Sequence, residues 1–114
     1  MSYIYVLSNP AMPSLVKIGL TKHSAAKRAA GLFTTGVPAP FTVEGSWKIH
    51  PALFSATETN IHRELQSYRY LDNREFFVLE VEEVTQFVDQ FVRTHRLSAS
   101  GGDLTLAEAW GLSV

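Results

Sequence analysis

The chain contains no cysteine among its 114 residues. This absence excludes disulfide frameworks, thiolate zinc sites, thiol nucleophiles and iron–sulfur clusters, so histidine and carboxylate side chains remain as the candidate metal ligands. No apolar stretch reaches the roughly 20 residues that span a bilayer, and no basic leader precedes an apolar segment at the start of the sequence. We therefore expect a cytoplasmic protein that does not insert into a membrane.

Common catalytic and recognition motifs are also missing. The sequence has no glycine-rich nucleotide loop, no HExxH motif, no nucleophile elbow and no EF-hand loop. It has no helix-turn-helix or zinc-finger pattern either. Any chemistry must therefore come from side chains that separate elements bring together.

Charge is scarce and unevenly distributed. Only 18% of the residues are charged and the net charge is −1, which argues against a protein that coats DNA through many basic contacts. Residues 1–50 hold five basic residues and one acid, whereas residues 51–114 hold five basic residues and ten acids. Two interpretations stay open: a chance distribution on a solvated surface, or a basic platform for a phosphate-bearing ligand that faces a metal-binding acidic group.

Apolar patterning predicts an α+β fold with a small three-stranded antiparallel sheet flanked by helices. The predicted strands cover residues 3–8, 15–20 and 41–49, and the predicted helices begin at Ala25, Pro51 and Glu80. The first connection is too short for a parallel crossover, so the sheet is expected to be antiparallel. Residues 71–79 are expected to form a short strand or turn.

The domain is expected to cover residues 1–97. Residues 98–114 begin with the sequence Ser-Ala-Ser-Gly-Gly, a composition typical of a flexible linker. We expect a short helical tail after it.

Side chains able to perform chemistry occur on several of these elements. Tyr5 lies in the first strand, Lys17 lies in the second, and Arg28 follows on the first helix. Glu58 lies on the second helix, with His62 four residues later on the same helical face.

At these residues the chain resembles the GIY-YIG nuclease superfamily, in particular its short phage-type branch (the meiotically up-regulated gene type), whose second motif usually reads Lys-Ile-Gly. Tyr3-Ile4-Tyr5 matches the first motif with Tyr in place of Gly. Lys17-Ile18-Gly19 matches the second motif with Lys in place of the leading Tyr. Residues 35–41, 58–65 and 74–77 also agree with segments typical of this branch.

The resemblance implies a GIY-YIG-like fold and a metal-dependent endonuclease that hydrolyses phosphodiester bonds, in DNA more than in RNA. In that case Tyr5 is the general base, Arg28 and Lys17 contact phosphate, and Glu58 binds Mg²⁺ or Mn²⁺. His62 is the remaining catalytic candidate. Because the ordinary pKa of tyrosine is about 10, Tyr5 needs a neighbouring cation that lowers it.

Further basic residues are candidates for substrate binding. The substrate-binding set is Lys17, Lys22, Lys27, Arg28, Lys48 and Arg74. Glu75 is expected to support Glu58 at the metal, or alternatively to pair with Arg74 or Arg69. His62 has an alternative as a hydrogen-bonding partner of Glu58 or of the backbone.

A second function stays open beside the endonuclease. Without family context, Tyr5 is typical of a core aromatic residue, and Glu58 and Arg28 are typical of solvated helix positions. Lys17 in place of Tyr leaves room for a catalytically inactive module that binds nucleic acid or a protein. Because no recognition motif is present, specificity is expected from a homodimer, from a partner protein or from the structure of the DNA.

Overall fold

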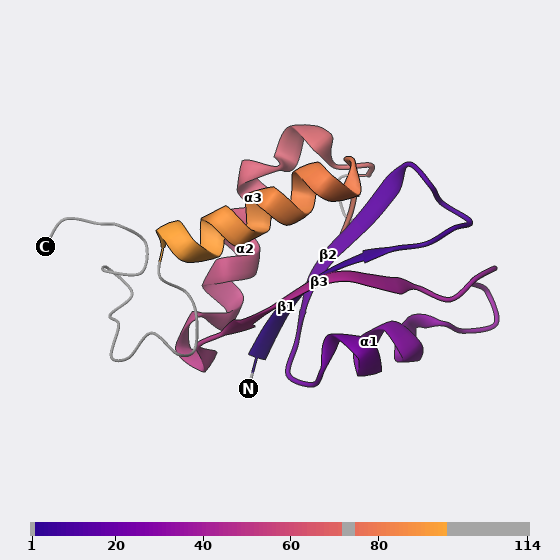
Figure 1. Cartoon of the computed structure of the whole chain (residues 1–114), viewed down its shortest axis with the longest axis horizontal. Helices are drawn as coiled ribbons and strands as arrows, with labels where there is room; N and C mark the ends of the chain where they lie inside the picture. Colours follow the sequence, from indigo (N-terminus) through magenta and orange to yellow (C-terminus); the bar gives the residue numbers. More distant parts are fainter. Residues whose placement is uncertain (1, 72–74, 96–114) are drawn as a thin grey trace, which may run out of the picture.

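The computed structural model describes residues 2–71 and 75–95 (Figure 1). The elements in chain order are β1 (Ser2–Ser8), β2 (Leu15–Thr21), α1 (Ala25–Leu32), β3 (Thr42–Ile49), the 3₁₀ helix η1 (Pro51–Leu53), α2 (Phe54–Glu64), the 3₁₀ helix η2 (Gln66–Tyr68), β4 (Phe76–Val78) and α3 (Val81–Thr94). The α+β class is therefore confirmed. The expected linker and tail at residues 98–114 lie outside the described residues.

The sheet has four strands in the order β3-β1-β2-β4, and all of its pairings are antiparallel. The prediction of three strands was therefore wrong. The additional strand is β4, which pairs Phe76 with Lys17 and Val78 with Leu15. A three-residue strand is too short to show a period-two pattern, and it forms here because the outer edge of β2 offers free backbone groups.

The central strand β1 is buried on both faces. Ile4 and Val6 belong to the main hydrophobic core, which also includes side chains of α2 and α3. Tyr5 and Leu7 point to the opposite face and pack against two alanines of α1. Figure 1 shows α1 on one side of the sheet and α2 with α3 on the other. The strand therefore directs Tyr5 away from the main core.

Helix α1 lies close to the sheet because its buried side chains are small. Ser24 caps the helix as predicted, and its side chain accepts a hydrogen bond from the Lys27 backbone N–H at 3.1 Å. Ala25 and Ala29 are buried, whereas Lys27 and Arg28 are exposed. The helix thus presents two basic side chains beside the face that carries Tyr5.

Helix α3 uses its apolar face within the chain. Its buried residues are Val84, Val88, Phe91 and Val92, and all of them belong to the main core. Among the helices of residues 2–71 and 75–95, none is both long and apolar enough to cross a membrane.

Candidate active site at the edge of the sheet

The outer edge of β2 is only partly covered by another strand. β4 pairs with residues 15–17 of β2 and no further. Beyond this point the Ile18 N–H donates to the Glu75 carbonyl oxygen at 3.1 Å. His62 Nε2 lies 3.1 Å from the Ile18 carbonyl oxygen. Helix α2 and the segment before β4 therefore bring polar groups to the place where strand pairing stops.

We call the set Tyr5, Lys17, Arg28, Glu58 and Glu75 the edge site. Its members come from β1, β2, α1, α2 and the residue before β4. All five are candidates from the sequence, and the structure brings them together at one edge of the sheet. Lys17 forms an ion pair with Glu75, and charged groups of the site shift the pKa values of Tyr5 and Glu58.

Tyr5 lies directly opposite Gly19 in the antiparallel register of β1 and β2. A Cβ atom on Gly19 would overlap the Tyr5 hydroxyl, and it would lie 2.7 Å from Tyr5 Cζ and 3.2 Å from Glu75 Oε2. Gly19 therefore provides the space that the Tyr5 hydroxyl occupies. Gly19 belongs to the Lys17-Ile18-Gly19 motif, but its role beside Tyr5 becomes visible only once the strand register is known.

Lys17 and Glu75 form the ion pair of the edge site. Lys17 Nζ lies 2.7 Å from Glu75 Oε2, and the two side chains are 11% and 40% exposed. The ammonium group also lies 5.2 Å from the centre of the Phe76 ring. Glu75 was expected to support Glu58 or to pair with an arginine, and the structure gives it Lys17 as an ion-pair partner.

Glu58 and Glu75 form a second close pair, of like charge. Burial raises the pKa of Glu58, and the charge of Glu75 and a hydrogen bond with it raise this pKa further, while Lys17 opposes the change. Two carboxyl groups that share one place disfavour the state in which both are ionised. A divalent cation would remove this repulsion.

The donor set fits Mg²⁺ or Mn²⁺. Mg²⁺ usually keeps several waters and binds one or two carboxylates, and Glu58 with Glu75 supplies that number. Within the part of the chain that the structure describes, no cluster of three or more His, Asp or Glu side chains could hold a metal ion.

Tyr5 is protonated in the resting protein. Its side chain is 1% exposed, and burial is the main reason why its pKa lies above the ordinary value of 10.0. A hydrogen bond with Arg28 lowers this pKa, whereas the charges of Glu75 and Glu58 raise it. Arg28 acts on this pKa in the direction expected of a neighbouring cation, but desolvation outweighs the single guanidinium.

His62 connects α2 to β2. The Nε2–H donates to the Ile18 carbonyl oxygen, and the ring meets the Phe77 ring edge-on at a centroid distance of 5.2 Å. Burial lowers the pKa of His62, which keeps the ring neutral near pH 7. This contact agrees with the backbone-partner alternative. His62 and Glu58 also line a shallow cavity of about 320 Å³.

The remaining candidates occupy three different places. Lys22, Lys27 and Arg28 line a second cavity of about 400 Å³ on the basic side of the edge site. Lys48 lies on β3, which is separated from β2 by β1, and it lines neither of these two cavities. Arg74 lies outside the described residues.

Comparison with known proteins identifies a family. The family model described as the T5orf172 domain matches residues 2–92. Neither a curated protein nor a solved structure matches the chain. The assignment to the GIY-YIG superfamily was therefore wrong, because the family that the match shows is the T5orf172 domain. This domain is associated with endonuclease-like proteins, which is consistent with a nucleic-acid-related role.

Proposed function

The chain belongs to the T5orf172 domain family, and from this premise we propose that it is a metal-dependent endonuclease that hydrolyses phosphodiester bonds in nucleic acid, in DNA more than in RNA. The observation that carries the proposal is the convergence of a buried tyrosine, an exposed arginine and two carboxylates at one sheet edge. Hydrolysis of a phosphodiester needs a positioned water, positive charge on the phosphate oxygens and stabilisation of the leaving oxygen.

Arg28 is the phosphate-binding residue of this proposal. It is exposed on α1 and its guanidinium interacts with the Tyr5 hydroxyl. A planar guanidinium donates two parallel hydrogen bonds to phosphate oxygens. Lys17 is largely buried and bound to Glu75, so we assign it to positioning Glu75 in place of the direct phosphate contact expected from the sequence.

Glu58 and Glu75 would hold the metal ion. A bound Mg²⁺ or Mn²⁺ supplies a Lewis acid for the phosphate and lowers the pKa of coordinated water. The carboxylates reach this position from α2 and from the residue before β4. Lys17 keeps Glu75 in place through the 2.7 Å ion pair.

Tyr5 would orient the attacking water and, once its own phenol proton has passed to solvent, would accept the proton of that water. Two of the three causes that raise its pKa are the negative charges of Glu75 and Glu58. Neutralising these charges would leave the lowering effect of Arg28 less opposed, so Tyr5 would be a better base with a divalent ion bound than without one. This dependence supports a reaction that needs a divalent ion.

Supercoiled plasmid provides the test. Wild-type protein and Glu58→Ala are incubated with Mg²⁺, with Mn²⁺ and with a chelator, and nicked and linear products are separated on a gel. We expect metal-dependent cutting by the wild type and a loss of at least 100-fold in Glu58→Ala, the size typical of removing one group that stabilises the transition state. Absence of cutting by the wild type with either ion would contradict the proposal.

Glu64→Ala is the matched control. Glu64 ends the same helix and is exposed, so its loss changes the net charge equally without touching the edge site. This variant should cut like the wild type. Equal losses in Glu58→Ala and Glu64→Ala would show that Glu58 is not specific to the reaction.

A binding module without turnover is the second candidate. The Lys17–Glu75 ion pair favours it, because a lysine already neutralises one of the two carboxylates. In that case a gel shift detects DNA binding in the presence of chelator while no ion produces cutting.

A further inference from the structure

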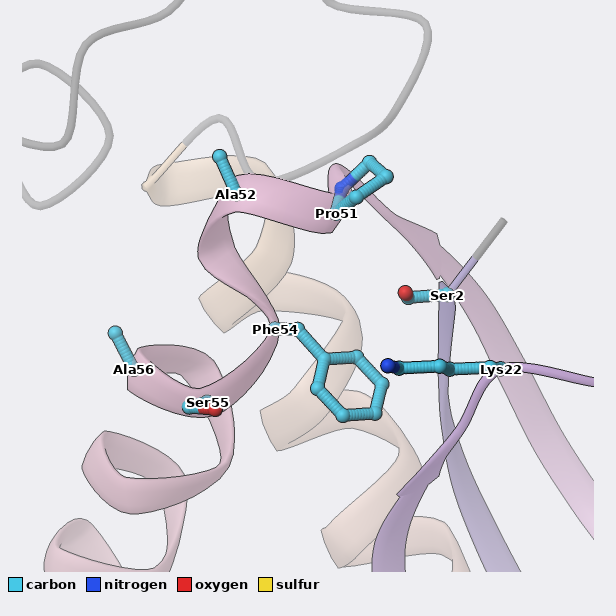
Figure 2. A pocket seen from close by; sticks show the side chains of 7 residues that line it. All are labelled: Ser2, Lys22, Pro51, Ala52, Phe54, Ser55 and Ala56. Carbon is cyan, nitrogen blue, oxygen red and sulfur yellow. The ribbon is translucent and has the colours of Figure 1, made fainter.

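Two adjacent cavities lead away from Arg28 toward the beginning of α2. The first, of about 400 Å³, is lined by Arg28, Lys27, Lys22 and Phe54 among others. The second, of about 630 Å³, is lined by Lys22, Phe54 and Ser55 among others (Figure 2). Because Lys22 and Phe54 border both cavities, we call the combined surface the Lys22–Phe54 groove. Each volume falls in the range of about 300–1,000 Å³ that small ligands occupy.

The ionisable residues that line this groove are all basic or histidine. They are Lys22, His23, Lys27 and Arg28, and no aspartate or glutamate lines either cavity. The cavity around Glu58 on the other side of the site contains a carboxylate. The groove is therefore the side from which a phosphate backbone can approach Arg28 without meeting like charge.

Phe54 places an aromatic ring in this basic groove. It is the first residue of α2 and half-buried, while the preceding Leu53 is anchored in the main core. Figure 2 shows the Lys22 side chain extended toward the ring, and Lys22 Nζ lies 5.7 Å from the ring centre. An aromatic face beside a lysine is the combination that proteins use to stack a base and hold its phosphate.

We propose that the Lys22–Phe54 groove binds an unpaired nucleotide next to the phosphate that Arg28 contacts, so that the substrate class is nucleic acid with a single-stranded segment. The base stacks on Phe54 and the phosphate lies near Lys22. In a continuous duplex the face of a base is covered by its neighbours, so stacking on Phe54 requires an unpaired base. The proposal rests on the proposed function only through the position of the cleaved phosphate at Arg28.

Fluorescence anisotropy with labelled 12-nucleotide strands tests the groove. The measurements are made in chelator, which prevents cutting, with single-stranded DNA, single-stranded RNA, the duplex of the same sequence and a single strand of abasic sites. Phe54→Leu should weaken binding to the single strands by about tenfold and leave binding to the duplex and to the abasic strand unchanged. Comparing the DNA strand with the RNA strand shows which of the two nucleic acids the groove binds.

Three variants separate stacking, charge and folding. Phe54→Tyr keeps the aromatic ring and should bind single strands like the wild type, and its melting temperature and that of Phe54→Leu check the fold. Lys22→Gln should weaken binding to the abasic strand as well and reduce the slope of log affinity against log salt by about 0.7. Arg93→Gln removes an exposed basic side chain from α3 and should leave single-strand affinity within twofold of the wild type.

The proposal is overturned if Phe54→Leu leaves single-strand affinity unchanged, or if it weakens duplex binding equally. It is also overturned if the wild type does not bind single strands. Because these measurements are made without metal, they are independent of cutting: single-strand binding through Phe54 without any cleavage would contradict the proposed endonuclease and leave the groove in place.

Discussion

The Tyr5 ring lies across Gly19, and the position that a Gly19 Cβ would occupy is taken by the Tyr5 hydroxyl. Cross-strand partners in an antiparallel sheet stand on the same face, within about 5.5 Å of each other. A phenol can lie over its partner only where the partner has no side chain. The position of the Tyr5 hydroxyl therefore depends on glycine at residue 19.

Gly19→Ala should displace Tyr5 and abolish cutting. The new methyl group would meet both Tyr5 Cζ and the Glu75 carboxylate, and overpacking of this kind costs about 1–3 kcal/mol. Urea unfolding measures the loss of stability, and plasmid nicking measures the loss of activity. Wild-type stability and cutting in this variant would contradict the arrangement of the edge site.

Gly31→Ala is the control for this substitution. Gly31 lies in α1, and a Cβ there would meet nothing within 4 Å. Because alanine favours helix more than glycine does, the free energy of unfolding should rise by up to about 1 kcal/mol. The free energy of unfolding should thus fall for Gly19→Ala and rise for Gly31→Ala.

Lys17→Met should destabilise the protein by about 1 kcal/mol. The substitution leaves Glu75 beside Glu58 without its cation, and the 40% exposure of Glu75 keeps the cost below that of a fully buried charge. Adding Glu75→Gln to Lys17→Met should restore part of this stability, because the uncompensated charge is removed. Urea unfolding of the single and double variants measures the coupling, and additive losses would contradict it.

The exposed pair Arg93–Asp89 provides a comparison. Its N–O distance of 2.9 Å resembles that of the Lys17–Glu75 pair, but Arg93 is 78% exposed. Arg93→Ala should therefore change the free energy of unfolding by no more than about 0.5 kcal/mol.

Most elements of the fold could be predicted from the sequence. The strands 3–8, 15–20 and 41–49 and the Ser24 cap followed from local signals, namely alternation, turn residues and a capping side chain. A short strand or turn was expected over residues 71–79, but the sequence did not predict that β4 joins the sheet, because its three residues gain their structure from pairing with β2.

The five residues of the edge site could be named from the sequence, but the charge interactions among them could be predicted only in part. Residue types and spacing indicated Tyr5, Lys17 and Glu58, because the chemistry of each side chain follows from the residue type. The direction of the Tyr5 pKa change depends on burial, and the Lys17–Glu75 pair depends on where β4 begins. Both are properties of the assembled sheet.

His62 should make the protein less stable in mild acid. Burial lowers its pKa in the folded state below the ordinary 6.5, so the folded state favours the neutral ring. This contribution is present above pH 6.5 and is lost as the pH falls through the folded-state pKa. The free energy of unfolding, measured in urea at several values between pH 7.5 and pH 5, should fall more steeply for the wild type than for His62→Gln.

His95→Gln is the control for the pH series. His95 ends the described chain after α3, and its Nδ1 contacts the Phe91 carbonyl oxygen at 3.0 Å, far from the edge site in sequence. Parallel pH profiles for wild type and His62→Gln would show that His62 is not the group responsible.

Magnesium should stabilise the wild type and not Glu58→Gln. Burial and Glu75 raise the pKa of Glu58 above 4.5 in the folded state, so its stabilising contribution is present below pH 4.5 and is lost as the pH rises through the folded-state pKa. In chelator at pH 7, Glu58→Gln should therefore be more stable than the wild type, and this difference should vanish toward pH 4.5.

An ion that binds the folded site adds about 1.4 kcal/mol at ten times its dissociation constant. Thermal unfolding with and without Mg²⁺ measures this gain, and an equal gain in Glu58→Gln would place the ion elsewhere.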